Sequence, residues 1–112
     1  IIKQGGIALG FQVGGALLDF LVLSILRRGD AYGYILTQEV RTILDVSETS
    51  LYPALRRLEK GGLLSTYDMP YQGRNRRYYR LTSQGQAALE GYIAEWQQFK
   101  KQMDSLLGEE EA

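Results

Sequence analysis

Four arginines stand within seven residues of the chain, and their type and spacing indicate a chemistry more directly than any other group. Arg74, Arg76, Arg77 and Arg80 lie beside two tyrosines. Guanidinium groups held this close repel one another unless an anion lies near, and arginine binds phosphate through paired hydrogen bonds. The cluster therefore predicts contact with a phosphate backbone. The alternative interpretation is a solvated, charged strand edge that prevents aggregation.

A second candidate group lies on a helix expected to begin near Ser47 and to stop at Gly61-Gly62. Leucines spaced at i, i+4 and i+7 define its inner face. We expect the short polar side chains at its start to contact base edges or phosphate, and the cations farther along to lie in or beside the major groove. An ordinary amphipathic surface helix has the same pattern. The candidate contacts here are Thr49, Ser50, Tyr52, Arg56 and Lys60.

Cysteine and histidine are both absent from the 112 residues. Their absence excludes disulfides, thiolate chemistry, nucleophile–histidine pairs and nearly every zinc site. Carboxylate-only catalysis is still chemically open, but no paired carboxylates share an evident cleft and no glycine-rich phosphate loop follows a strand. We therefore expect no enzymatic activity, no metal and no cofactor, and the lack of thiols predicts a cytoplasmic protein.

The net charge of zero conceals an uneven distribution. Lysine and arginine number 13 and so do aspartate and glutamate, but residues 41–80 carry a net charge of +4 and residues 81–112 carry −4. Because local fields decide binding, the basic middle third agrees with a polyanionic partner.

The elements that position these residues follow from the hydrophobic spacing. Helices are predicted over 16–28, about 32–44 with an inner stripe of Ile35, Leu36, Val40, Ile43 and Leu44, and about 47–60. The period then becomes alternating, which predicts strands over 63–67 and 76–82 around a loop at 68–75. This order predicts a mainly α fold with a small β-hairpin: a winged helix-turn-helix followed by a long C-terminal dimerisation helix.

The last predicted helix spans 83–107 and carries two apolar series with a spacing of seven residues, which is typical of a helix–helix seam. Its apolar surface exceeds what so small a domain can cover, so we expect a second copy to pair with it. Trp96 at the middle of the seam either packs only against the partner, the favoured interpretation, or also lines a pocket for a flat aromatic effector. The seam residues are Leu89, Tyr92, Trp96, Phe99, Met103 and Leu106.

The chain ends complete the predicted domain organisation. Residues 1–15 are interpreted as a poorly ordered leader, 16–82 as the winged domain, 83–107 as the dimerisation helix and 108–112 as an acidic tail. The apolar run from Ile7 to Leu26 has about the length of a membrane span. Asp19 in its middle and its several glycines argue against that interpretation.

Three segments resemble the PadR family of bacterial transcriptional regulators. They are ALLDFLVLSILRRGDAYGYILTQEV (16–40), SETSLYPALRRLEKGGLL (47–64) and GRNRRYYRLTSQGQAAL (73–89), and the similarity extends over about 16–107. The chain resembles the short members, which have one C-terminal helix. The resemblance implies a homodimeric winged-helix repressor of detoxification, phenolic-acid or multidrug-export genes that binds dyad-symmetric double-stranded DNA. It also implies that 49–55 begin the recognition helix, that 74–80 form the basic wing, and that Trp96 falls where some short members bind planar drugs.

The resulting hypothesis is a dimeric DNA-binding repressor that a small effector releases. The rival from another class is an interaction adaptor that uses the same domain without binding DNA. An enzyme is a distant third. Retention of specific DNA in a salt titration distinguishes the first two.

Overall fold

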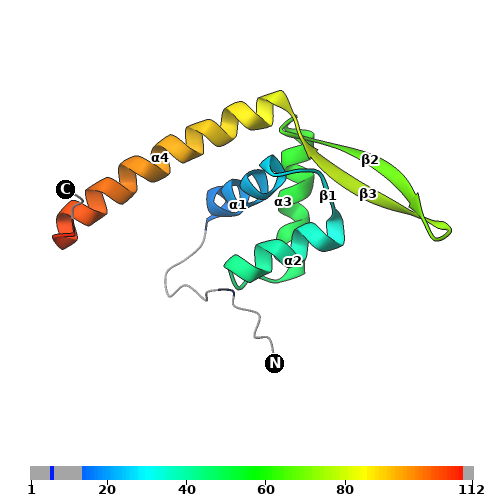
Figure 1. The fold of residues 1–112 in the computed structure, drawn as a ribbon, viewed down its shortest axis with the longest axis horizontal. Helices are drawn as coiled ribbons and strands as arrows, with labels where there is room; N and C mark the ends of the chain where they lie inside the picture. The colour runs from blue at the N-terminus through cyan, green and yellow to red at the C-terminus, as the bar shows by residue number, and fades with distance from the viewer. Residues whose placement is uncertain (1–5, 7–13, 110–112) are drawn as a thin grey trace.

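The computed structural model describes residue 6 and residues 14–109, and it shows a small helical body with two projecting arms (Figure 1). The predicted leader at 1–15 and the end of the acidic tail lie mostly outside the described residues. The elements, in chain order, are α1 (Gly15–Arg27), β1 (Ala31–Tyr32), α2 (Gly33–Ile43), α3 (Glu48–Lys60), β2 (Leu64–Tyr71), β3 (Arg74–Leu81) and α4 (Ser83–Leu107). The fold is the winged helix-turn-helix predicted from the sequence.

The core lies where α1, α2 and α3 meet the base of the sheet and the start of α4. The expected inner face of α3 is confirmed, since Leu51, Leu55 and Leu58 are buried. The expected stripe of α2 was partly wrong, because Ile35 and Ile43 are 37% and 47% exposed. Ile35 lies about 100° around the helix from the buried Leu36, and Ile43 is the last residue of α2.

The hairpin is longer than the sequence pattern predicts. The expected loop at 68–75 is wrong: β2 and β3 pair continuously from Leu64↔Leu81 to Tyr71↔Arg74. The turn consists of Gln72 and Gly73, which both have positive φ (52° and 79°), as a tight hairpin turn requires. Pro70 does not interrupt β2, because β2 is an edge strand in the order β1-β3-β2 and an edge strand tolerates a missing N–H.

A third strand, which the sequence pattern did not reveal, ties the hairpin to the body. β1 is two residues long and pairs antiparallel with β3, with Ala31 opposite Tyr79 and Tyr32 opposite Tyr78. Two strands alone are unstable in water. The link through β1 therefore holds the base of the hairpin beside α2, while its tip extends away from the helices (Figure 1).

The last helix has a core half and a projecting half (Figure 1). Thr82 caps it: its Oγ1 accepts a hydrogen bond from the Gly85 N–H at 2.9 Å and donates one to the Gly62 carbonyl at 2.7 Å. Leu89 is 0% exposed and packs in the core of the chain, so its expected place on an exposed helix seam is wrong. No helix in the described part of the chain has the length and hydropathy needed to span a membrane.

Candidate nucleic-acid interface

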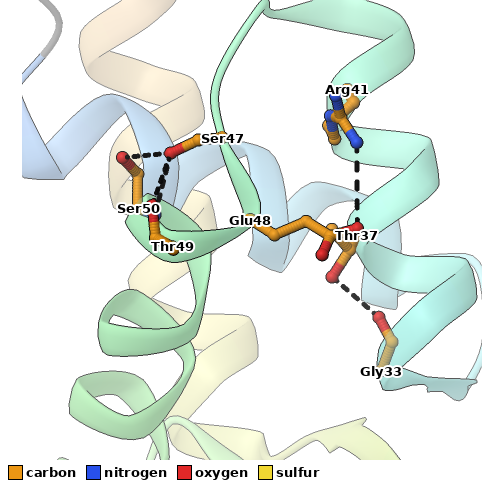
Figure 2. A network of polar contacts seen from close by, with 7 residues as sticks. All are labelled: Gly33, Thr37, Arg41, Ser47, Glu48, Thr49 and Ser50. Atoms are coloured by element: carbon orange, nitrogen blue, oxygen red, sulfur yellow. Dashed lines mark hydrogen bonds and ion pairs between the residues drawn. The ribbon is translucent and has the colours of Figure 1, made fainter.

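The turn between α2 and α3 fixes the start of the candidate DNA-reading helix (Figure 2). The Ser47 hydroxyl accepts a hydrogen bond from the Ser50 backbone N–H at 3.3 Å, as the sequence predicts for a capping residue. The same hydroxyl lies 2.9 Å from the Thr49 hydroxyl and 3.0 Å from that of Ser50. Glu48 reaches across to Arg41 near the end of α2 at 3.8 Å. The first turn of α3 is therefore held by polar contacts on both sides.

The outward face of α3 carries most of the predicted contact residues. At about 100° per residue, five exposed positions fall within an arc of roughly 100°, opposite the buried leucines. They are Thr49, Tyr52, Pro53, Arg56 and Lys60. Ser50 is exposed but lies about 60° beyond Pro53, and its hydroxyl bonds to Ser47. The arc therefore presents a hydroxyl, a phenol and two cations to one side.

Helix α3 packs beside the hairpin, and Tyr79 of β3 is buried near this contact. Tyr79 is 9% exposed, and burial is the main reason that its pKa is raised above the ordinary tyrosine value. The charge of Arg77 lowers this pKa, that of Glu59 raises it and that of Arg56 lowers it, so charged groups of both elements act on the phenol. Thr66 of β2 also donates a hydrogen bond to Glu59 of α3 at 3.1 Å. The outward arc of α3 and the helix-facing side of the hairpin thus form one basic edge.

The four hairpin arginines are not a single cluster, because side chains alternate between the two faces of a strand. Arg77 lies on the helix-facing side of β3, with a loose ion pair to Asp68 at 3.8 Å. Arg74, Arg76 and Arg80 occupy positions of the opposite parity. Arg74 is exposed beside the turn. The alternation therefore separates Arg77 from the other three arginines.

Arg76 and Arg80 belong to a layer of aromatic rings on the outer face of the hairpin. The Arg76 Cζ lies 3.5 Å from the centroid of the Tyr71 ring and 4.1 Å from that of Tyr32, a cation–π sandwich. The Arg80 Cζ lies 4.7 Å from the Tyr67 centroid. Tyr78 stacks on Tyr67 with centroids 5.4 Å apart and an interplanar angle of 10°. These two guanidiniums are therefore held against tyrosines.

Asp30 joins that layer to the end of α1. It accepts a hydrogen bond from the Tyr67 hydroxyl at 2.6 Å and pairs with the Arg80 Nε at 3.5 Å. The hydrogen bond to Asp30 is the largest cause of the raised pKa of Tyr67. Sequence reasoning missed Asp30 and the tyrosine layer. The sequence did carry a signal for this layer, because tyrosines at alternate positions of β2 and arginines at alternate positions of β3 are placed on the same face of the hairpin.

The predicted seam on α4 divides at about its middle. Tyr92 stacks on Phe20 of α1 with centroids 5.7 Å apart, and burial is the largest cause of its raised pKa. Farther along, Trp96, Phe99 and Leu106 are 49%, 57% and 78% exposed, and Met103 is half-buried. The first part of the series therefore anchors α4 to the body, and the second part is an apolar face open to solvent.

Residues 14–109 contain no group of three or more potential metal-ligating side chains. The described part of the chain thus offers a basic edge, an aromatic layer and an apolar helix face. A basic edge made of a helix and a ribbon can bind a phosphate backbone and reach base edges.

Comparison with known proteins gives concordant matches. The profile of the Transcriptional regulator PadR-like family matches residues 22–91. The crystal structure of smu.1704 from Streptococcus mutans is 36% identical with a TM-score of 0.80, over 93% of this chain and 99% of that one. A PadR family transcription regulator from Clostridium difficile is 36% identical with a TM-score of 0.74, over 80% and 97%. Transcriptional regulator Rv3488 of Mycobacterium tuberculosis is 48% identical over 61 residues, 54% of this chain and 57% of its own length.

Proposed function

Because the chain belongs to the PadR-like family of transcriptional regulators, we propose that it acts as a dimeric repressor bound to dyad-symmetric DNA. Its targets are genes for detoxification, phenolic-acid metabolism or multidrug export, and a small effector releases it from them. A repressor of bacterial genes works in the cytoplasm, which is where we place it. The family consists of regulators rather than enzymes.

The observation that carries the DNA-binding proposal is the meeting of α3 and the hairpin at Tyr79. Thr66 of the ribbon bonds to Glu59 of the helix. The charges of Arg77 from the ribbon and Arg56 from the helix both act on the Tyr79 phenol. Thr49, Tyr52 and Lys60 extend this edge along α3. A helix in the major groove with a basic ribbon beside it is the geometry by which winged helix-turn-helix domains contact DNA.

Within this edge the proposed roles differ by position. Thr49 reads base edges from the first turn of α3, with Ser50 supporting that turn through Ser47. The hydroxyl of Tyr52 and the charges of Arg56 and Lys60 bind phosphate. Arg74 and Arg77 bind the backbone or the minor groove from the hairpin, whereas Arg76 and Arg80 contribute mainly by stiffening it through the tyrosine layer.

Salt-dependent binding tests the DNA-binding roles. The protein first selects a duplex from a random library, and its affinity for that duplex is then measured across a salt series. Each lost phosphate contact lowers the salt slope by about 0.9, hence by about 1.8 for a dimer. Arg56→Gln or Arg77→Gln should show this loss. Thr49→Ala should change the selected sequence and leave the slope unchanged. No binding at low salt would contradict the proposal and support the adaptor alternative.

Pairing of two copies through α4 accounts for its open apolar face. Trp96 and Phe99 of α4 are about half exposed in a single protomer. Because about half of each ring is already covered, burial of the remainder against a second copy stabilises association by about 0.8–1.5 kcal/mol for each side chain, half the value for full burial. Twofold pairing would also present two α3 helices to one dyad-symmetric site.

Trp96→Ala tests the dimer and the effector together. We expect this variant to be monomeric in sedimentation at micromolar concentration, with a helical content close to that of the parent protein. Trp96 is the single tryptophan of the chain, so its fluorescence reports on the seam alone. Quenching by planar aromatic compounds would support an effector pocket there. A parent protein that sediments as a monomer would refute the dimer.

A further inference from the structure

Arg56 and Arg57 are neighbours in the chain, but they lie on different flanks of α3. Arg56 is exposed on the outward arc of α3, about 100° around the helix from Arg57. The Arg57 Nη2 instead pairs with the Asp19 Oδ1 of α1 at 2.5 Å. The Asp19 side chain is only 15% exposed, and that of Arg57 is 53% exposed. One of the two cations is therefore neutralised by a carboxylate, and the other is open to a phosphate.

The Arg57 guanidinium lies beside the N-terminal turns of α1, where the Asp19 carboxylate favours its positive charge. A Cβ built on Gly15 would lie 3.5 Å from the Arg57 Nη2, so the guanidinium rests along the first turns of α1. The N-terminus of a helix carries a partial positive charge that disfavours a cation. Asp19 supplies the opposing negative charge. Both Asp19 and Arg57 also influence the pKa of Tyr92, although burial has the larger effect on it.

Arg57 lies near the face of α3 that is proposed to contact DNA, so its ion pair with Asp19 bears on DNA binding. Arg57 is four residues after Pro53 and therefore lies only about 40° outside the arc that faces DNA in the proposed function. If it were released from Asp19, a long guanidinium at that border would be free to pair with a phosphate beside the groove. A phosphate contact made there would increase affinity for every sequence alike.

We propose that Asp19 is a specificity-determining residue, which withholds Arg57 from the phosphate backbone and so limits binding to random DNA. The inference rests on the proposed DNA-binding function. It assigns a role to a residue of α1 that does not itself touch DNA. Loss of the carboxylate should add one phosphate contact to each protomer and two to a dimer.

The test measures affinity for a random duplex and for a selected duplex with the variants Asp19→Asn, Arg57→Gln and the double variant. Two added contacts steepen the salt slope by about 1.8 units. Between 50 and 200 mM salt, the affinity of Asp19→Asn for random duplex should therefore fall by roughly ten times the factor found for the parent protein. Asp19→Asn should therefore bind random duplex more tightly at low salt, and its ratio of specific to random affinity should decrease. A role limited to stability would lower both affinities and leave the slope unchanged.

Two further variants make the outcome decisive. Arg57→Gln should keep the parent slope, and adding it to Asp19→Asn should abolish the gain. Arg56→Gln is the matched control and should lose about 1.8 units of slope. The inference is overturned if Asp19→Asn leaves random binding unchanged, or if Arg57→Gln loses as much slope as Arg56→Gln. If Arg56→Gln changes nothing, the proposed function itself has failed.

Discussion

Gly85 and Gly91 lie less than two turns apart in α4, and replacing each with alanine should have opposite effects on stability. A Cβ on Gly85 would lie 2.2 Å from the Leu63 carbonyl oxygen and 2.6 Å from the Leu81 Cδ1. A Cβ on Gly91 would meet nothing within 4 Å. Gly85 is therefore the point where the start of α4 closes onto the body, and Gly91 is an exposed position inside the helix.

The expected magnitudes follow from these distances. Overpacking costs about 1–3 kcal/mol, and the contact of Gly85 with a backbone oxygen cannot be relieved by a side-chain rotation, so the upper end applies. Gly91→Ala removes the conformational cost of a helical glycine and should stabilise the fold by about 0.5–1 kcal/mol. In a domain of this size, each 1 kcal/mol shifts the melting temperature by roughly 4–8 °C.

Urea and thermal unfolding, followed by circular dichroism, measure both variants against the parent. All three proteins must be compared at one protomer concentration, because a dimer gains apparent stability with concentration. Gly91 lies about 100° around α4 from Tyr92, away from the exposed apolar face, so its substitution should leave association unchanged. A Gly85→Ala protein as stable as the parent would refute the close approach of α4 to Leu63.

Two other substitutions test hydrogen bonds that hold α4 and the hairpin in place beside the candidate interface. Thr82→Ala removes the cap of α4 and the hydrogen bond to the Gly62 carbonyl, and it should lower the free energy of unfolding by about 1–2 kcal/mol in urea titration. The hydrogen bond to Asp30 raises the pKa of Tyr67 above its ordinary value of 10.0. The protonated phenol is thus favoured in the folded state, so its stabilising contribution is complete below about pH 10 and is lost as the pH rises through the folded-state pKa. Ultraviolet titration of tyrosinate should show Tyr67 among the late phenols, together with Tyr79 and Tyr92, whose pKa values are also raised. Tyr67→Phe should remove one late phenol, and a titration in which it removes none would contradict the hydrogen bond.

The periodic parts of the fold could be predicted because their signals are local. The leucines of α3 recur with the helical spacing, Ser47 is a strong capping residue, and the bounds of α4 at Ser83 and Leu107 match those expected. Strand boundaries could not be predicted as well, since Pro70 and Gly73 are typical of loops. Only the pairing with β3 shows that Pro70 occupies an edge position where its missing N–H has no cost.

The candidate site likewise has features that could be predicted from the sequence and features that could not. Composition and spacing by themselves determined that the chain has one basic helix-and-ribbon region, no thiol or imidazole chemistry and more apolar surface on its last helix than its body can cover. Tertiary structure alone decided which of the arginines have a carboxylate partner and which are free to bind phosphate. Arg57 is paired with Asp19 and Arg80 with Asp30, partners 38 and 50 residues away in the chain, and Leu89 is in the core. The physical reason is that periodicity specifies the face on which a side chain lies, whereas its charge partner and its burial depend on distant segments that only the folded chain brings together.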